Sequence, residues 1–456
     1  MEKVINYIKS NSDSYVEQLK DYLRIPSIST SVKHKNEMKK CANYVAGQLK
    51  SAGMKKVKII PTAGHPLVFG ELIHDKKLPT VLIYGHYDVQ PVDPLDLWKS
   101  PPFEPEIRNG KIWARGANDN KGQNFVHIKS VEAFKNTGTK LPVNVKFLIE
   151  GEEEIGSPNL SKFLKTNKSL LSCDAVMISD TSLYQPGIPT INYGLRGLCF
   201  MEVEVIGPNR DLHSGSFGGA VANPINVLAD MISKLIDKNG RITIPDFYND
   251  VQKLSAVERN NYKKLKFSDA KFAKELNVKK LAGEKGYSTL ERLSGRPTLD
   301  CNGIWGGYTE NGAKTVLPSQ AYAKISMRLV PDQDPKTIAK LFAKYIKQIA
   351  PKSVKVNVKE LHGGLPIVVS FDNPAVKAAA KAASKAFGKE TVFTREGGSI
   401  PIVVEFAKQL DVPTILMGLG LDTDNIHSPN EHFNLSNFSR GILASAYFFE
   451  EFAKIK

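Results

Sequence analysis

Five segments of the chain place a histidine or a carboxylate just beyond an apolar run or inside a glycine-rich turn. In chain order they are His86 and Asp88 in GHYD, Asp119 in RGANDNKG, Glu152 to Glu154 in EGEEEIG, Asp180 at the end of CDAVMISD, and His427 in NIHSPNE. Imidazole nitrogens and carboxylate oxygens, without any thiolate, form a ligand set that suits Zn²⁺ or Mn²⁺. These residue types therefore indicate a site for divalent metal ions.

Each segment taken alone has a simpler explanation. His86 and Asp88 would suit a surface pair, Asp119 a helix N-cap, and residues 152–154 a solvated acidic loop. Three adjacent carboxylates repel one another, however, unless a cation lies close to them. Metal-dependent hydrolysis needs both carboxylate ligands and a general base, and neighbouring residues of this run could take one role each. The five segments together favour the metal site.

The elements that must position these residues are predicted from the spacing of apolar residues. Strands are predicted at 57–60, 66–72, 80–86, 143–151, 173–180 and 412–418, and helices at 1–24, 37–52, 120–134, 159–167, 374–387, 400–409 and 437–453. The strand at 80–86 is apolar on both faces, as in a buried sheet covered by helices. Alternating strands and helices predict an α/β sheet, in which ligands bind beyond the carboxyl ends of the strands.

The middle of the chain follows another pattern. Strands are predicted at 198–207, 313–319, 321–330 and 353–361, and helices at 223–237 and 334–350. This β-α-β-β-α-β order is that of a ferredoxin-like sandwich, interrupted by a lysine-rich and mainly helical insertion at about 241–300. We therefore predict a catalytic α/β domain with a mixed sheet, split into residues 1–194 and 365–456, and an inserted α+β domain at 195–364.

Composition narrows the possible partners and locations. The formal charge is +15, but the lysines are scattered over predicted helices, so neither nucleic-acid binding nor membrane binding is predicted. The first residues, MEKVINYIKS, lack the apolar run of a signal peptide, and no stretch reaches 18 consecutive apolar residues. The four cysteines form no Cys-x-x-Cys pair. We expect a cytoplasmic protein.

The segments also carry a family resemblance. The motifs are, in order, GHYDVQP, ARGANDNKG, EGEEEIGS, YGLRG, RDLHSGSFGG, SMRLVP, REGGSIP and NIHSPNE. They resemble the metallopeptidase superfamily of carnosinase-type dipeptidases, aminoacylases and succinyl-diaminopimelate desuccinylases, and most closely its cytosolic dipeptidase branch. The resemblance spans His86 to Glu431. Many relatives have a second Asp where this chain has Asn120.

The resemblance implies a two-metal centre with two Zn²⁺ or Mn²⁺ ions per subunit. His86 and Asp180 would hold one ion, Glu154 and His427 the other, and Asp119 would bridge them. Asp88 would orient His86. Glu153 would be the general base that takes a proton from the attacking water and passes it to the leaving amine. The peptide bond after Asp119 is expected to be cis, as in similar enzymes.

The resemblance further implies substrate contacts and an assembly. His213 and Arg328 resemble the residues that bind the oxyanion and the substrate carboxylate, and Gly397, Gly398 and Ser399 resemble a substrate-binding turn. The inserted domain would then be a lid and dimerisation domain. We expect a homodimer in which His213 works in the active site of the partner.

Three functions remain open at this point. The first is hydrolysis of dipeptides or similar short peptides. The second is deacylation of N-acyl amino acids, which uses the same metals and mechanism, so the motifs do not separate the two. The third is a non-catalytic binding protein that engages anionic partners through its charge. That protein would need a damaged metal site, whereas every expected ligand type is present.

Overall fold

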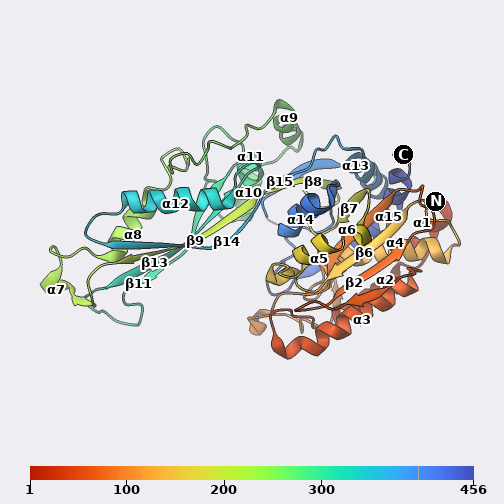
Figure 1. The fold of residues 1–456 in the computed structure, drawn as a ribbon, viewed down its shortest axis with the longest axis horizontal. Helices are drawn as coiled ribbons and strands as arrows, with labels where there is room; N and C mark the ends of the chain where they lie inside the picture. Colours follow the sequence, from red (N-terminus) through yellow and green to blue (C-terminus); the bar gives the residue numbers. More distant parts are fainter. Residues whose placement is uncertain (399, 456) are drawn as a thin grey trace. The chain divides into compact units, whose positions relative to one another are not determined.

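The chain, drawn as a ribbon in Figure 1, divides into two units. Each unit is built around its own apolar core. The computed structural model describes residues 1–398 and 400–455. The first unit comprises Met1–Tyr193, Val369–Thr394 and Pro401–Lys456, and the second comprises Gly194–Val368 and Arg395–Ile400. Among the described residues, no helix is both long enough and apolar enough to cross a membrane.

A mixed sheet organises the first unit, and nine of its strands are described, of which β15 and the last residues of β8 and β16 belong to the second unit. Their order is β1-β2-β6-β3-β7-β17-β8-β15, with β16 paired to β8. β6, β3, β7 and β17 are parallel, whereas β2 and β8 run antiparallel to their neighbours. The bounds are β1 Lys58–Ile60, β2 Leu67–Leu72, β3 Thr80–His86, β6 Asn144–Glu150, β7 Ala175–Ile178, β8 Thr190–Leu195, β15 Ile367–Val368, β16 Val392–Glu396 and β17 Thr414–Gly418. The predicted α/β class with a large mixed sheet is confirmed.

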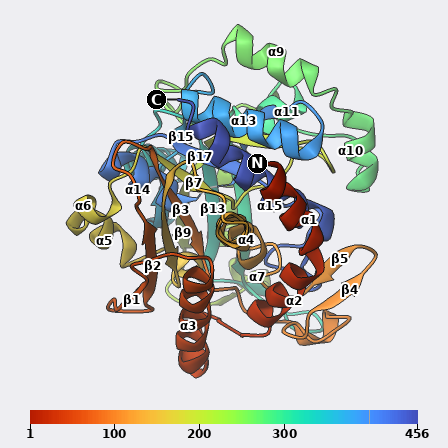
Figure 2. The ribbon, with the colours of Figure 1, turned by 90° about the vertical axis from the view of Figure 1, so that its right-hand side faces the viewer.

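Helices cover both faces of this sheet. In Figure 2, α5, α6 and α14 lie on one side of the strands, and α4 and α15 lie on the other side with α1 and α2. The bounds are α1 Glu2–Ser10, α2 Ser12–Leu23, α3 Lys35–Ser51, α4 Lys121–Asn136, α5 Leu160–Thr166, α6 Lys168–Leu171, α13 Pro374–Phe387, α14 Pro401–Leu410 and α15 Leu435–Phe452. β3 and β6 are almost entirely buried because both of their faces are covered, which explains why they are mostly apolar. Lys146 is the charged residue in the middle of β6, and its Nζ donates to the carbonyls of Leu170 and Ser172.

A small antiparallel sheet ties together two segments that are far apart in the sequence. Its order is β18-β5-β4, with β4 Glu106–Arg108, β5 Lys111–Trp113 and β18 His432–Asn434. The pairing of β18 with β5 brings the loop before α4 next to the loop after β17. These strands of three residues were not predicted, because so short a stretch shows no periodicity.

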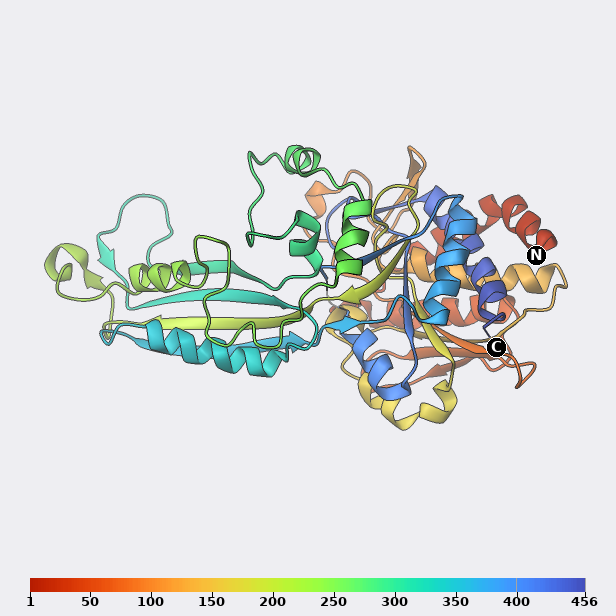
Figure 3. The same cartoon turned by 90° about the horizontal axis from the view of Figure 1, so that it is seen from above.

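The second unit contains a four-stranded antiparallel sheet of order β11-β13-β9-β14. In β9 every second residue joins the core formed with α8 and α12, and Figure 3 shows α12 running along the strands. The sheet and its helices are β9 Gly197–Ile206, α8 Pro224–Ser233, β11 Thr298–Gly306, β13 Gln320–Leu329, α12 Pro335–Ile349 and β14 Lys355–Gly364. The shorter elements are β10 Leu212–His213, α7 Ser214–Phe217, α9 Ala256–Lys264, α10 Asp269–Glu275, α11 Thr289–Ser294 and β12 Val316–Leu317.

Two predicted elements were wrong. The stretch 313–319 is not a strand of this sheet, because only Val316–Leu317 is extended and it pairs with β10. The sheet uses β11 instead, whose edge position leaves most of its side chains exposed and removes the apolar alternation that identifies a strand. The predicted helix 1–24 is two helices, broken at Asn11, where the backbone leaves the helical region.

Candidate metal centre

The candidate ligands lie at the carboxyl ends of the parallel strands. His86 is the last residue of β3, Asp180 follows β7 by two residues, and Glu153 and Glu154 belong to a short 3-10 turn after β6. Asp119 precedes Asn120, the N-cap residue of α4, and His427 lies beyond β17. Because β6, β3, β7 and β17 are adjacent and parallel, their ends meet at one edge of the sheet.

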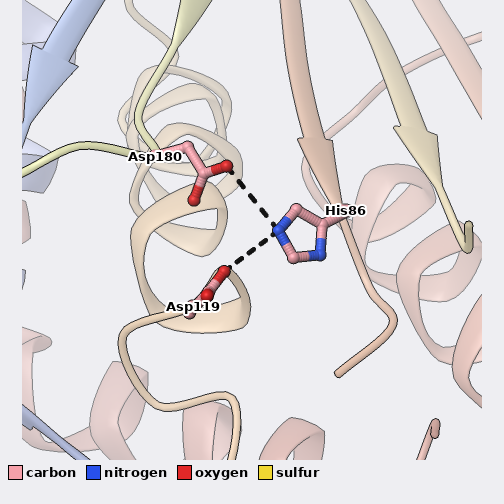
Figure 4. A group of neighbouring side chains, drawn as sticks. All are labelled: His86, Asp119 and Asp180. Atoms are coloured by element: carbon pink, nitrogen blue, oxygen red, sulfur yellow. Dashed lines mark ion pairs between the residues drawn. The ribbon is translucent and has the colours of Figure 1, made fainter. Parts of the chain in front are cut away.

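His86, Asp119 and Asp180 form the first ligand group (Figure 4). Nε2 of the fully buried His86 lies 3.2 Å from Oδ1 of Asp119 and 3.7 Å from Oδ2 of Asp180. Nδ2 of Asn120 donates to Oδ1 of Asp180 at 2.7 Å, which leaves Oδ2 facing His86. The three candidate ligand atoms lie within 4.8 Å of one another, a spacing that suits one shared cation.

Asp119, Glu154 and His427 form the second ligand group. Nε2 of His427 lies 2.8 Å from Oδ2 of Asp119 and 3.3 Å from Oε2 of Glu154. Nε2 of Gln90 donates to Oε2 of Glu154 at 2.8 Å. The two oxygens of Asp119 thus face different groups, as the oxygens of a bridging ligand do in a two-metal site. The peptide bond between Asp119 and Asn120 is cis, as expected.

The chemistry of these side chains fits a pair of divalent cations. Asp119, Asp180, Glu153 and Glu154 bring four carboxylates together, and like charges at this spacing need positive partners. Burial lowers the pKa of His86, but contacts with Asp119, Asp180 and Asp88 outweigh burial and raise this pKa well above its usual value. Contacts with Asp119 and Glu154 raise the pKa of His427 to about 10. The same acidic surroundings that raise both histidine pKa values would favour bound cations.

Two buried ligand atoms without hydrogen bonds also favour a cation site. Among the described residues, the buried atoms Nε2 of His86 and Oε1 of Glu154 make no hydrogen bond of acceptable geometry. A buried polar atom without a partner is costly, and each of these atoms belongs to a ligand group. Both atoms would be satisfied by coordination to a cation.

The carboxylate of Asp88 does more than orient an imidazole. Nδ1 of His86 is 3.0 Å from the backbone carbonyl of Asp88 and 3.4 Å from its carboxylate, so the backbone makes the shorter contact with the ring. The carboxylate itself accepts the N–H groups of Glu153 at 3.2 Å and of Glu154 at 3.1 Å. Asp88 thereby holds the turn that carries both glutamates.

Glu153 belongs to neither ligand group. Burial raises the pKa of its carboxyl, and Asp180, Glu154 and Asp119 add to the rise against the opposing effect of His86. Burial and Asp119 also raise the pKa of Glu154 to about 7. A carboxyl whose pKa moves toward neutrality is a better proton acceptor at neutral pH. The turn therefore offers one ligand and one candidate base.

The substrate residues predicted from the resemblance lie in the second unit. His213 ends β10 and caps α7, where its Nδ1 accepts the N–H of Ser216 at 3.2 Å. With Nδ1 accepting, we assign the ring hydrogen to Nε2, which lies 3.3 Å from Oγ1 of Thr315. The ring is exposed, and a Cβ at Gly215 would lie 2.7 Å from its Cε1, so a larger residue there would displace the ring.

Arg328 and the glycine turn are connected through a residue that the sequence had not singled out. Arg328 lies half-buried on β13, and burial together with the charge of Arg328 lowers the pKa of Arg196 to about 10. Nε of Arg196 donates to the carbonyl of Gly397 at 3.1 Å, and its backbone N–H donates to the carbonyl of Gly398 at 3.2 Å. Arg196 therefore holds the turn. Ser399 lies outside the described residues.

Comparisons with known proteins agree with one another. Residues 82–451 match the model of peptidase family M20/M25/M40. The chain is 32% identical to the Cys-Gly metallodipeptidase dug1 of Schizosaccharomyces pombe, across 100% of this chain and 99% of that protein. It aligns with the structure of human carnosine dipeptidase 1 at a TM-score of 0.86 and 33% identity, covering 99% and 98% of the two chains. For the M20 family metallo-carboxypeptidase Sso-CP2 of Sulfolobus solfataricus the TM-score is 0.85 and the identity 34%, covering 96% and 99%.

Proposed function

The chain belongs to peptidase family M20/M25/M40, and from this premise we propose that it is a dipeptidase that works with two divalent cations. The observation that carries the proposal is Asp119, whose two carboxylate oxygens face two separate ligand groups. Similarity over the full length to a Cys-Gly metallodipeptidase and to carnosine dipeptidase supports dipeptides as the substrate class.

The ligands divide into two sets around Asp119. His86 and Asp180 would hold one cation, and Glu154 and His427 would hold the other. Two such ions, when bound, supply the Lewis acidity that polarises a peptide carbonyl and acidifies a water molecule. Because the donors are nitrogen and oxygen without sulfur, we propose Zn²⁺ or Mn²⁺.

Glu153 is the proposed general base. Its carboxylate would accept a proton from the attacking water and deliver this proton to the nitrogen of the leaving amine. Asp88 holds the backbone N–H groups of Glu153 and Glu154, so the base and its neighbouring ligand keep separate positions. Glu154 is engaged by Gln90 and His427, which leaves the proton transfer to Glu153.

The second unit would supply the substrate contacts as a lid and dimerisation domain, with predicted bounds 195–364. The guanidinium of Arg328 would bind the terminal carboxylate of the substrate through paired hydrogen bonds. The turn at Gly397 and Gly398 would present backbone groups to the substrate. His213, whose Nδ1 accepts the N–H of Ser216, would donate its Nε2–H to the scissile carbonyl in the active site of the partner subunit, so the active enzyme would be a homodimer.

A mixing experiment tests this shared site. The variants His213→Ala and Glu153→Gln, each inactive alone, are combined under conditions that exchange subunits. Random mixing gives mixed dimers in which one of the two sites has both native residues, so activity should return to about a quarter of wild type. Failure to recover activity after proven exchange would place His213 in its own subunit or outside catalysis.

A substrate screen tests the activity itself. The purified protein is assayed with dipeptides that include Cys-Gly and carnosine, with tripeptides and with N-acyl amino acids, in the presence of Zn²⁺ or Mn²⁺. The proposal expects the highest kcat/KM on dipeptides. Faster turnover of N-acyl amino acids would assign the chain to deacylation, and faster release of a C-terminal residue from tripeptides would assign it to carboxypeptidase activity.

We also propose that the protein is located in the cytoplasm. Cys41, Cys173, Cys199 and Cys301 are all free thiols, with Cys41 and Cys199 buried. Free thiols are typical of proteins in a reducing compartment. Cell fractionation with compartment markers tests the location.

A further inference from the structure

One buried carboxylate joins the loops that carry Asp119 and His427, two of the three residues of the second ligand group. Glu431 follows His427 by four residues, and its side chain is completely buried. Its Oε2 accepts Nη1 of Arg115 at 2.8 Å and the N–H of Gly116 at 2.9 Å. Its Oε1 accepts the N–H groups of Asn118 and Asp119, both at 3.0 Å.

We propose that Glu431 is a positioning residue that sets the separation between Asp119 and His427, and thereby the affinity of the second cation. The inference rests on the proposed two-cation function. Glu431 belongs to neither ligand group, so it would act only through the loops that it connects. Residues that hold metal ligands in place typically change metal affinity by about 10-fold to 100-fold when replaced.

The loop before α4 depends on Glu431 for its backbone hydrogen bonds. Residues 115–119 form turns without a sheet partner, and buried N–H groups of such a loop must find acceptors elsewhere. Three of these groups, those of Gly116, Asn118 and Asp119, find them in the same carboxylate. The direction in which Asp119 presents its two oxygens therefore follows from the position of Glu431.

The loop after β17, which carries His427, also depends on Glu431. Asn425, His427 and Asn430 have φ values of 57°, 60° and 63°, a left-handed conformation that costs about 1 kcal/mol or more for a residue with a side chain. Such a conformation persists only where the surroundings enforce it. The loop is anchored at its start by Asp424, which accepts Nδ2 of Asn118 at 3.1 Å, and at its end by Glu431.

The two ligand groups differ in how much they need this anchor. His427 has 56% of its side chain exposed, so few packing contacts hold its ring in place. His86 is fully buried at the end of β3, and Asp180 is held by Asn120. Loss of the Glu431 contacts should therefore weaken the second group first and leave the first group able to bind.

The variant Glu431→Gln tests this inference. It keeps the size of the side chain but replaces one acceptor oxygen with an NH₂ group, which would face a donor of residues 115–119. Binding of Zn²⁺ to metal-free protein is measured by calorimetry, and metal content is measured after gel filtration. The expected result is one cation at near wild-type affinity and a second bound at least about 10-fold more weakly.

Glu132→Gln is the matched control. Glu132 is also buried and also pairs with a cation, Nζ of Lys129 at 2.6 Å, but it lies on α4 away from both loops. This variant should bind two cations as wild type does. A third variant, Glu431→Asp, keeps the charge while shortening the side chain, and its second-cation affinity should fall between those of wild type and Glu431→Gln.

Three outcomes would overturn the inference. They are wild-type affinity for both cations in Glu431→Gln, equal weakening of both cations in that variant, and the same loss in Glu132→Gln. If Glu431→Gln does not fold, Glu431→Asp decides, because an unchanged second-cation affinity in that variant refutes the positioning role. Absence of peptidase activity in the wild type would defeat the proposed function while leaving this cation-binding comparison readable.

Discussion

Replacement of His127 with glutamine should make the stability of the protein less sensitive to acid. His127 lies on α4 and is buried, with Nδ1 3.0 Å from Oγ of Ser445 and Nε2 2.9 Å from Oγ of Ser179. Burial lowers the pKa of His127 from its usual 6.5 to about 3. The ring is therefore neutral in the folded protein across the range in which the unfolded chain takes up a proton.

The sign and size of the effect follow from these two pKa values. The stability contributed by the neutral ring is present above pH 6.5 and is lost as the pH falls from 6.5 toward 3. Each pH unit in this window lowers the free energy of unfolding by about 1.4 kcal/mol, so about 2 kcal/mol is lost between pH 8 and pH 5. The loss at pH 5 depends little on the exact pKa in the folded protein, because the folded ring is still neutral there.

Urea unfolding followed by circular dichroism at pH 8 and pH 5 measures this loss. Metal-free protein is used, so that cation binding does not contribute. The stability difference between wild type and His127→Gln should shift by about 2 kcal/mol in favour of the variant at pH 5. A difference that stays constant with pH would show that His127 is protonated while the protein is folded.

Three further results are expected. Glu153→Gln should retain two cations and lose at least about 100-fold in kcat, whereas loss of a cation would mean that Glu153 and Glu154 have exchanged roles. Addition of Zn²⁺ or Mn²⁺ to the metal-free protein at 100 times Kd should stabilise it by about 2.7 kcal/mol for each cation bound, and an unchanged melting temperature would contradict the two-cation site. Gly122→Ala would place a Cβ 2.0 Å from the backbone oxygen of Ala117, so it should lower stability by more than about 1 kcal/mol, and a wild-type melting temperature would contradict this.

The parts of the fold that could be predicted are those in which burial imposes a pattern on the sequence. β3 and β6 are covered on both faces, so most of their residues are apolar, a pattern that is visible without a structure. His86 ends one of these strands and Glu153 follows the other closely, so the edge of the sheet and its candidate ligands could be predicted together. Elements without such burial carried no comparable signal, as the exposed edge strand β11 demonstrates.

Contacts that depend on tertiary structure could not be predicted. Arg196 and Gly397 are separated by 201 residues, and their hydrogen bond arises only after the chain has folded. The same holds for Gln90 and Glu154, which no local spacing connects. A long polar side chain at such a position has no periodic pattern around it, because its partner lies on a different element.

The roles of the acidic residues were the hardest feature to predict from this sequence. Asp119 and Glu154 face histidines in a candidate metal centre, whereas Asp88 and Glu431 accept backbone N–H groups and hold loops in place. In the sequence all four are carboxylates close to a histidine or a glycine-rich turn, and their types alone do not separate the two roles. The direction of the donors separates them, because a carboxylate that is saturated by N–H groups has little capacity left for a cation. An amide substitution should therefore act in different ways at the two kinds of site. At a ligand it removes a cation contact directly. At Glu431 it replaces an acceptor oxygen with an NH₂ group that faces the N–H donors of the loop.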